Sequence, residues 1–559
     1  MPTTKPGRCA TMRERMRETA FCKAAARLWG RGWVRGIVEL TIAFAVVATC
    51  RWEAVRQPYW WDAMGYVADG ARGIVAAGMS PLIYWDWDPG HPPLWYYLVA
   101  VTWKVFRGDV PTQLFAAHLM IYGFAALGLW ATYRIGRAIR DTLTGLMAAG
   151  LLFVSAAYFA QAGQLLVDLP IAALSAAAMY CVLRDRPYGY ALAATAAVLM
   201  KESIIPVLAA LMAVAAIEGF SRSWKRGWVW VGMAMVPFVL FGVWWLWRFE
   251  ATGWVLGSPN MDAQLTHVDS LSDMTVAKLA DNFARAGWRW IFGEGPLFYA
   301  LPLMALGFAP SLSTWRGLIA GMRSNADGRR WRRSLEYVWG SLWRNRALFY
   351  TLVVIASVFG SLAVMSYHLG TSARYWLPAY PFMFLLVAMG LRRLGMVPAI
   401  VLAVLLGWML SAEWMAAAHK GFDSTSTLAF NKEVPNRDDS LQYERGVHVL
   451  QQMAQYIGSD YPEAKVYCKW PTVVVLDRPE VGYVARKIAI SSNADDTDLN
   501  LAVMNSFVYG DLSDRIALGR RYTLTPLKTF ADGQFKVEVV RLEVRKGPRP
   551  LLDYILPGR

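Results

Sequence analysis

The chain of 559 residues is 56% hydrophobic and contains 27 tryptophans, and many of its apolar runs approach bilayer thickness, which excludes an ordinary soluble domain. Its net charge is +16, but the basic residues gather in short loops between apolar runs, so the charge indicates membrane topology and not nucleic-acid binding. The five cysteines show no metal-ligand or disulfide spacing. We therefore expect a polytopic α-helical membrane protein.

The first apolar run follows a long basic head. Residues 1–35 are rich in arginine, and we interpret the run at 36–52 as an uncleaved anchor, because the basic region is too long for a signal peptide. The positive-inside rule places the head in the cytoplasm. Further apolar runs lie near 113–133, 143–160, 168–183, 188–200, 203–218, 228–247, 296–314, 347–366, 376–391 and 395–414. These runs predict about 11 transmembrane helices in a domain at 36–418.

The apolar run at 94–106 decides the topology of everything that follows it. It is short for a span, which needs roughly 20 residues. If it crossed the membrane, the arginine-rich segments 134–141, 222–227 and 315–346 would lie outside, against the charge bias. We therefore expect a helix lying in the outer interface, within a large first outer loop at 53–112.

The region at 419–559 has a different character and lies outside the membrane in this topology. Helical spacing is present in "ERGVHVLQQMAQYIGS" (444–459). The segments "AKVYCKWPTVVVL", "NLAVMNSFVY" and "GQFKVEVVRLEVR" alternate as strands do. This pattern predicts a small soluble α/β domain at the C-terminal end.

Five motifs follow one another along the chain. They are "PYWWDAMGYVADGARGI" (58–74), "DPGHPPLWYYL" (88–98), "QLLVDLPIAAL" (164–174), "LMKESIIP" (199–206) and "SARYWLPAYPF" (372–382). With the expected topology, their order resembles the C-superfamily (GT-C) glycosyltransferases of the protein O-mannosyltransferase and aminoarabinose transferase type. The resemblance covers roughly residues 36 to 415 and does not extend to the C-terminal domain.

The resemblance implies a polyprenyl-phosphate-linked sugar as donor and an acidic residue of the first outer loop that acts on the acceptor. This chain departs from the family in two places. His118 stands in the second span, where the family often has an arginine, and the acidic pair common at the start of the loop is reduced to Asp62.

Asp62 is the candidate general base. It follows two tryptophans, which favour the membrane interface, so its carboxylate is expected near headgroup level. A base is needed there to take the proton of an acceptor hydroxyl while phosphate leaves from the opposite face of the anomeric carbon, which predicts inversion if a single displacement operates. The alternative is that Asp62 only caps the helix that follows it.

Asp168 is the second candidate catalytic residue. It opens a span two residues before Pro170, at the expected outer face. Carboxylates at the membrane boundary are costly and often functional, but Asp before Pro is also favourable in a first helical turn. Asp62 and Asp168 are also the candidate ligands if a divalent cation binds, and the sequence leaves open whether one is needed.

The stretch "WDWDPGHPPLWYYL" (85–98) is interpreted as the second half of an active-site loop. Asp86, Asp88 and His91 are candidate substrate-binding residues beside a turn that the prolines stiffen. The alternatives are a solvated loop for the two carboxylates and a turn residue for the histidine.

A leaving lipid phosphate needs fixed cations at the outer face. The topology places Lys201, Arg374 and His368 at tight outer turns, which makes them candidate phosphate binders, and Arg248 is a weaker candidate. The alternatives are a local ion pair between Lys201 and Glu202, and an Arg374 side chain that extends toward the headgroups.

The sequence thus predicts a membrane glycosyltransferase. Its expected partners are a polyprenyl-phosphate-linked sugar, a lipid, glycan or protein acceptor, and membrane lipids. Its expected location is the bacterial inner (plasma) membrane, with the N-terminus cytoplasmic and both the active site and the C-terminal domain extracytoplasmic. The alternatives are a secondary transporter and a non-catalytic envelope scaffold, although the chain shows no internal repeats of the transporter kind.

Overall fold

The structure, a computed structural model, describes residues 32–80, 91–106, 108–253, 296–308, 346–369, 373–418, 441–505, 511–532 and 535–545. The long or apolar helices are α3 (Gly32–Cys50), α5 (Leu94–Val105), α6 (Val110–Ile139), α7 (Thr142–Val154), α9 (Asp168–Leu183), α10 (Pro187–Met200), α11 (Ile205–Arg222), α12 (Trp224–Thr252), α15 (Pro296–Phe308), α18 (Arg346–Leu369), α19 (Tyr380–Arg393) and α20 (Met396–Ala418). Short helical segments between them are η1 (Trp52–Arg56), η2 (Ala63–Val67), α4 (Ala68–Ala76), α8 (Ala156–Gln161), η3 (Glu202–Ile204) and η5 (Ala373–Ala379).

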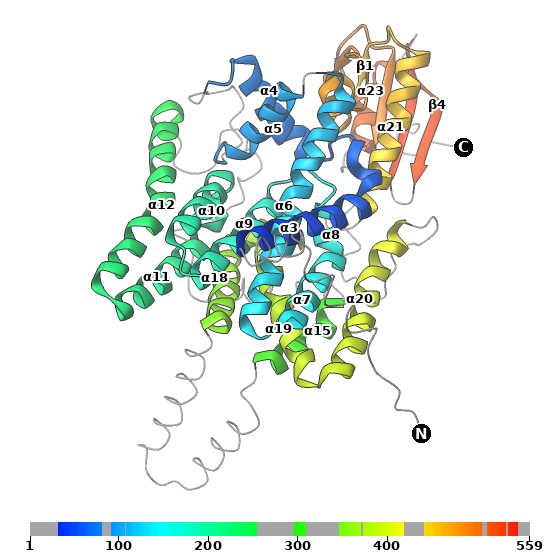
Figure 1. The fold of residues 1–559 in the computed structure, drawn as a ribbon. Helices are drawn as coiled ribbons and strands as arrows, with labels where there is room; N and C mark the ends of the chain where they lie inside the picture. The colour runs from blue at the N-terminus through cyan, green and yellow to red at the C-terminus, as the bar shows by residue number, and fades with distance from the viewer. Residues whose placement is uncertain are drawn as a thin grey trace, which may run out of the picture.

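The helix α6 lies at the centre of the helical region and packs against α3, α7 and α9 (Figure 1). Asp109 begins it by accepting a hydrogen bond from the Thr112 backbone N–H (3.1 Å). Near its other end, a methyl group added at Gly136 would lie 2.7 Å from the Gly145 Cα atom of α7. The two helix backbones therefore touch at a pair of glycines, a mode of packing common between membrane helices.

Four of the described helical segments are long and apolar enough to cross a membrane: Trp33–Cys50, Val110–Ile139, Glu202–Arg222 and Trp224–Thr252. Shorter apolar helices accompany them, among them α7, α9 and α10. The total of about 11 spans stays a prediction.

Charged side chains pair where several of these helices end. Glu39 of α3 contacts Arg134 of α6 (2.5 Å), and Arg392 at the end of α19 contacts Asp141 before α7 (2.8 Å). Asp185, between α9 and α10, contacts Arg222 of α11 (2.7 Å). The basic segments 134–141 and 222–227 thus lie at helix ends and are paired with carboxylates there.

The C-terminal domain contains a five-stranded sheet in the order β2-β1-β3-β5-β4. Its elements are α21 (Gln442–Asp460), β1 (Val466–Tyr467), α22 (Thr472–Asp477), η6 (Pro479–Val481), β2 (Ile490–Ser491), β3 (Leu501–Asn505), α23 (Asp511–Gly519), β4 (Tyr522–Asp532) and β5 (Phe535–Val544). The strand β1 pairs in parallel with β2 and β3, whereas β5 pairs antiparallel with β3 and β4. The helix α21 packs against β4 and β5, so this region is an α/β fold, as predicted.

Within this domain, the helix at 444–459 is confirmed as α21, and "GQFKVEVVRLEVR" forms β5. The prediction for "AKVYCKWPTVVVL" is wrong beyond β1, because Thr472–Asp477 is helical. In the membrane region, the run at 143–160 is not one helix but α7 and α8, which are separated at Ser155 by an extended backbone (φ −68°, ψ 135°). The run at 94–106 is a helix, α5, as expected.

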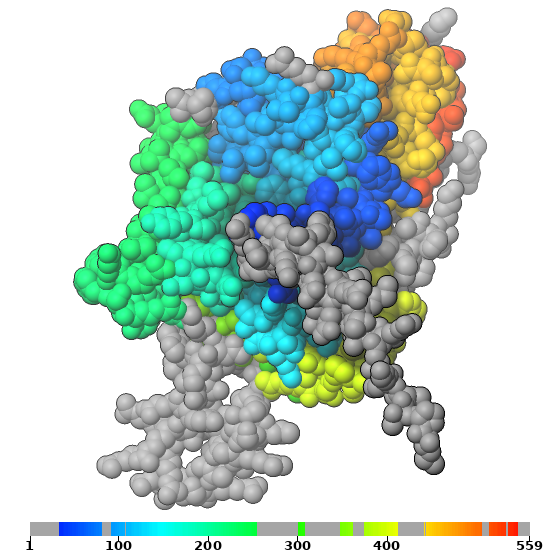
Figure 2. Space-filling model, viewed as in Figure 1, coloured from blue at the N-terminus to red at the C-terminus, as the bar shows by residue number. Residues whose placement is uncertain are grey.

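The helical region and the C-terminal domain share one hydrophobic core, which includes Trp60, Ile121, Val447 and Val537. Figure 2 shows the C-terminal domain seated directly against the N-terminal segments. Arg51, after α3, makes a buried link between the two: its Nη2 donates to the Tyr443 hydroxyl (2.8 Å) and to the Glu444 carboxylate (2.9 Å).

Candidate active site

Asp62 pairs with Arg374, although the two residues are 312 positions apart in sequence. The Arg374 Nη2 donates to the Asp62 Oδ2 over 2.6 Å. Asp62 occupies the N-cap position of η2, but among the described residues its side chain makes no capping hydrogen bond. The interpretation of Asp62 as only a helix cap is therefore wrong, and its carboxylate faces a cation.

Asp168 pairs with Lys201 and joins it to the first pair. The Lys201 Nζ donates to the Asp168 Oδ1 over 2.5 Å, and the Arg374 Nε lies 3.9 Å from the Asp168 Oδ2. The exposed fraction is 5% for the Asp168 side chain and 10% for each of the two cations. Asp62, Arg374, Asp168 and Lys201 thus form one continuous, largely buried charged cluster, which we call the four-charge cluster.

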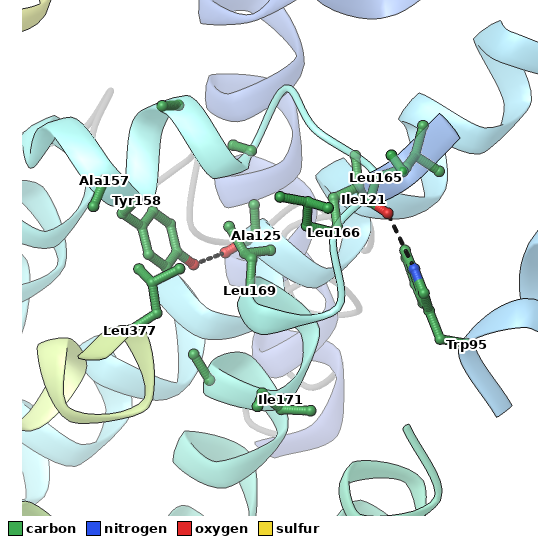
Figure 3. Close-up of a cluster of buried hydrophobic side chains, with 14 of the residues drawn as sticks. Trp95, Ile121, Ala125, Ala157, Tyr158, Leu165, Leu166, Leu169, Ile171 and Leu377 are labelled. Atoms are coloured by element: carbon green, nitrogen blue, oxygen red, sulfur yellow. Dashed lines mark hydrogen bonds between the residues drawn. The ribbon is translucent and has the colours of Figure 1, made fainter. Parts of the chain in front are cut away.

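The cluster forms because three element boundaries meet above an apolar core. Asp168 is the first residue of α9, Lys201 follows the last residue of α10, and Arg374 lies in η5. Figure 3 shows part of the apolar core around the start of α9, where Leu169 lies next to Leu377.

Two hydrogen bonds fix the turn that leads into Asp168. The Trp95 Nε1 donates to the Leu165 carbonyl (3.1 Å), and the Tyr158 hydroxyl donates to the Ala125 carbonyl of α6 (2.6 Å), as Figure 3 shows. Because both aromatic donors are buried and satisfied, they hold the backbone before α9 against α5, through Trp95, and against the central helix α6, through Tyr158. The position of Asp168 is therefore set by packing, not by solvent.

Tyr375 is a site residue that the sequence analysis missed. Its ring lies under both cations, 4.8 Å from the Lys201 Nζ and 5.0 Å from the Arg374 Cζ. Its hydroxyl also accepts a hydrogen bond from the Arg374 Nη2 (3.0 Å). A tyrosine directly after a candidate arginine was the available signal, since cations favour the faces of aromatic rings.

Tyr66 is a second residue that the sequence analysis missed. Burial, and then the nearby Asp62 carboxylate, raise the pKa of the Tyr66 phenol. The phenol thus stays protonated at neutral pH and can act as a hydrogen-bond donor beside Asp62.

His91 belongs to a neighbouring pair. Its Nδ1 lies 3.0 Å from one oxygen of the Glu202 carboxylate and 3.1 Å from the other. The expected local ion pair between Lys201 and Glu202 is therefore replaced by two pairs to more distant partners, and Glu202 orients the imidazole.

The structure places the other candidates differently. Asp86 and Asp88 lie outside the described residues, and so does the His368 side chain, although its backbone belongs to α18. Arg248 is buried near the end of α12, with its guanidinium 6.0 Å from the centre of the Trp244 ring. Arg374 does not extend toward headgroups, since it is buried in the four-charge cluster.

A divalent cation does not match the arrangement of the two aspartates. Each carboxylate contacts a cationic side chain. In the described part of the chain, no group of three or more His, Cys, Asp or Glu side chains is placed to hold a metal ion. The described residues of the cluster are thus arranged for ion pairing and not as a metal-binding donor set.

The fold is similar to that of ArnT from Cupriavidus metallidurans, an aminoarabinose transferase. The crystal structure of ArnT bound to undecaprenyl phosphate matches with a TM-score of 0.51 and 14% identity, over 91% of this chain and 98% of that one. The apo structure matches with a TM-score of 0.50 and 14% identity, over 90% and 97% of the two chains. No protein-family model and no curated protein sequence matches this chain.

At 14% identity, this similarity shows the fold alone. The fold resembles that of ArnT, a protein of the aminoarabinose transferase type that the sequence motifs resemble, so this resemblance is confirmed at the level of fold. The archaeal oligosaccharyltransferase of Archaeoglobus fulgidus is less similar, with a TM-score of 0.42 and 12% identity over 91% of this chain and 74% of that one.

Proposed function

We propose that this chain is a membrane glycosyltransferase that moves a sugar from a polyprenyl-phosphate donor to an acceptor hydroxyl. The observation that carries the proposal is the four-charge cluster, in which two carboxylates and two cations adjoin at the ends of apolar helices. The undecaprenyl phosphate bound to ArnT, whose fold is similar, supports a lipid phosphate as the leaving group.

Asp62 is the general base in this proposal. Its side chain is 28% exposed, which makes it more open than Asp168, at 5%. An acceptor hydroxyl gives its proton to the Asp62 carboxylate while the hydroxyl oxygen forms a bond to the anomeric carbon. The bond from that carbon to the phosphate oxygen breaks on the opposite face, so a single displacement inverts the configuration.

The two cations balance the charge that develops in this step. Before reaction, the positive charges of Lys201 and Arg374 face the negative charges of Asp62 and Asp168. When Asp62 takes a proton, the cluster gains one net positive charge while the departing phosphate gains one negative charge. Stabilisation of this kind increases toward the transition state, so it accelerates the reaction and does not only tighten binding.

The proposed reaction takes place at the extracytoplasmic face. The Arg134, Asp141 and Arg392 side chains gather at one end of α6, whereas the Arg51 carbonyl, next to the C-terminal domain, accepts a hydrogen bond from Tyr122 in the other half of α6. If the basic end is cytoplasmic, as the charge bias requires, the four-charge cluster and the C-terminal domain face outward. The proposal keeps a cytoplasmic head at 1–35, a membrane domain at 36–418 and a bacterial inner-membrane location.

Transfer from a labelled polyprenyl-phosphate sugar to lipid, glycan and peptide acceptors in liposomes tests the proposal, with and without a chelator. Lys201→Ala should lose about one to two decades of activity, because a charge-assisted contact is worth roughly 1.5 to 3 kcal/mol. Lys225→Ala, which removes an exposed lysine at the start of α12, is the control and should keep its activity. Failure of the wild type with a broad panel of donors would contradict the proposal.

A further inference from the structure

The C-terminal domain holds the residue three positions before Asp62 by two hydrogen bonds. The Tyr59 backbone N–H donates to the Val481 carbonyl (3.0 Å), and the Tyr483 hydroxyl donates to the Tyr59 carbonyl (3.0 Å). Both backbone groups of Tyr59 are thus bonded to the region around η6.

The next residue, Trp60, is held by packing against the same domain. Its indole lies over Gly446 of α21, where an added methyl group would come within 2.4 Å of the ring. Its ring centre also lies 6.0 Å from that of Phe535 in β5, edge to face. A side chain larger than hydrogen at position 446 would have to displace the Trp60 ring.

Trp61 completes the contact and has an unusual backbone. Its φ angle is 48°, in the left-handed region that a tryptophan adopts only when its surroundings hold it there. Its ring packs edge to face on Trp470, with 5.8 Å between ring centres. Trp470 follows β1 and lies in the C-terminal domain.

Trp470 touches the chain on both sides of Asp62. Besides Trp61, its indole covers Gly65, where an added methyl group would lie 2.4 Å from the Cη2 atom. Trp61 and Gly65 are themselves joined, since the Gly65 backbone N–H donates to the Trp61 carbonyl (3.1 Å). The turn that carries Asp62 is therefore closed by its own hydrogen bond and covered by one indole ring.

We propose that the C-terminal domain is a positioning element of the active site and that Trp470 is its main positioning residue. The indole keeps Trp61 in its left-handed conformation and thereby fixes the direction of the Asp62 carboxylate toward Arg374. This inference rests on the proposed role of Asp62 as base. Among the described residues, the Trp470 indole makes no hydrogen bond to Asp62, Lys201 or Arg374. It acts on Asp62 through the backbone of the turn.

The test measures sugar transfer by Trp470→Ala and Trp470→Phe. If Trp470 positions Asp62, kcat should fall by roughly 10- to 100-fold in Trp470→Ala, the usual effect of a misplaced catalytic group. The KM for the donor should change much less than kcat, since both cations keep their contacts to Asp168. Trp470→Phe should lose less activity.

The matched control is Arg478→Gln, which removes another link between the C-terminal domain and the first outer loop. Arg478 forms an ion pair with Asp69 of α4, away from the turn at Asp62. Its kcat should stay near the wild-type value. An equal loss of kcat in Arg478→Gln and Trp470→Ala would overturn the proposal. It would mean that any weakening of the contact between the C-terminal domain and the first outer loop lowers kcat, with no special role for Trp470.

A paired substitution adds a rescue experiment. Gly65→Ala should lower kcat, because the new methyl group meets the far end of the indole. Phenylalanine at position 470 lacks that far end, so the double variant Gly65→Ala with Trp470→Phe should recover part of the loss. A double variant no better than Gly65→Ala alone would contradict the contact.

Hydrogen–deuterium exchange of the full-length protein in detergent provides a readout that needs no enzymatic activity. Amides of residues 59–65 should exchange faster in Trp470→Ala than in wild type, whereas those of α21 should not change. Unchanged exchange at 59–65 would overturn the inference even if transfer is observed. Failure of the wild type to transfer sugar would instead contradict the proposed function and leave the exchange result to decide the positioning role.

Discussion

Two aspartates of this protein occupy the same local position but use their carboxylates differently. Asp62 and Asp141 both stand at the N-cap of a helical segment, and each contacts an arginine, Arg374 at 2.6 Å or Arg392 at 2.8 Å. Asp141 also accepts hydrogen bonds from the Thr144 backbone N–H and hydroxyl, both at 2.8 Å. Among the described residues, Asp62 accepts no such capping bond.

The difference separates a structural carboxylate from a candidate catalytic one. Burial raises the pKa of Asp141, but the bonds from Arg392 and Thr144 outweigh it and lower the pKa to about 2. A carboxylate stabilised as an anion in this way is a poor base, because it resists protonation. Asp62 keeps acceptor capacity that its own helix does not use, so an acceptor hydroxyl can bind there.

The largest expected effect is on transfer by the two asparagine variants. Asp62→Asn should lower kcat by about 10² or more, the scale of a general base, because the amide cannot take a proton. Asp141→Asn should leave kcat near the wild-type value, since asparagine also caps helices. Both are measured as turnover of a labelled donor, with thermal unfolding as a check on folding. Full activity of Asp62→Asn would remove the distinction between the two aspartates.

The next largest effect is the loss of donor use when Arg374, and not Arg392, is replaced. Arg374→Ala should lower donor use by about one to two decades, since a charge-assisted hydrogen bond is worth roughly 1.5 to 3 kcal/mol. Arg374→Lys should recover only part of this, because an ammonium lacks the planar fork of a guanidinium. Arg392→Ala should affect stability and leave donor saturation unchanged. Equal donor saturation curves for the Arg374→Ala and wild-type proteins would contradict the phosphate-binding role.

The smallest effect concerns the cap itself. Asp141→Ala should destabilise the protein by about 0.5–2 kcal/mol, the usual cost of losing a cap, and Asp141→Asn by less. Because the folded-state pKa of Asp141 lies below its usual value of about 3.9, its contribution is present above that pH and is lost as the pH falls toward 2. Thermal unfolding of wild type and Asp141→Ala between about pH 2 and pH 7, a range that includes this titration, measures both effects. A constant difference in Tm down to pH 2 would contradict the assignment.

The sequence predicted helices better than the details of the C-terminal domain. The helix α5 was located as a short apolar run, and α21 by its helical spacing. It failed at Thr472–Asp477, since a run of valines favours a strand by propensity and only tertiary packing decides otherwise. The strand β4 was missed because it is an edge strand with mostly exposed residues and Pro526 within it, which weakens the alternating pattern.

The candidate site could be predicted as residue types but not as pairs. Asp62, Asp168, Lys201 and Arg374 were identified from their places at the expected membrane boundary, and the structure brings all four together. Their partners are 33 to 312 positions apart in the sequence, and no local pattern encodes such contacts. For the same reason, nothing in the sequence indicated that Trp470 covers the turn at Asp62.

The shortness of α9 and α10 has a consequence for the depth of the site. These helices contain 16 and 14 residues, so they rise only about 24 and 21 Å, against a hydrocarbon thickness of about 30 Å. They meet at Asp185, whose partners Arg222 and Arg226 mark the cytoplasmic boundary in the proposed topology. In that topology, Asp168 and Lys201 would lie several ångströms below the outer headgroups. A donor anchored by its own hydrocarbon chain can therefore reach the cluster sideways from the bilayer, without rising into the water.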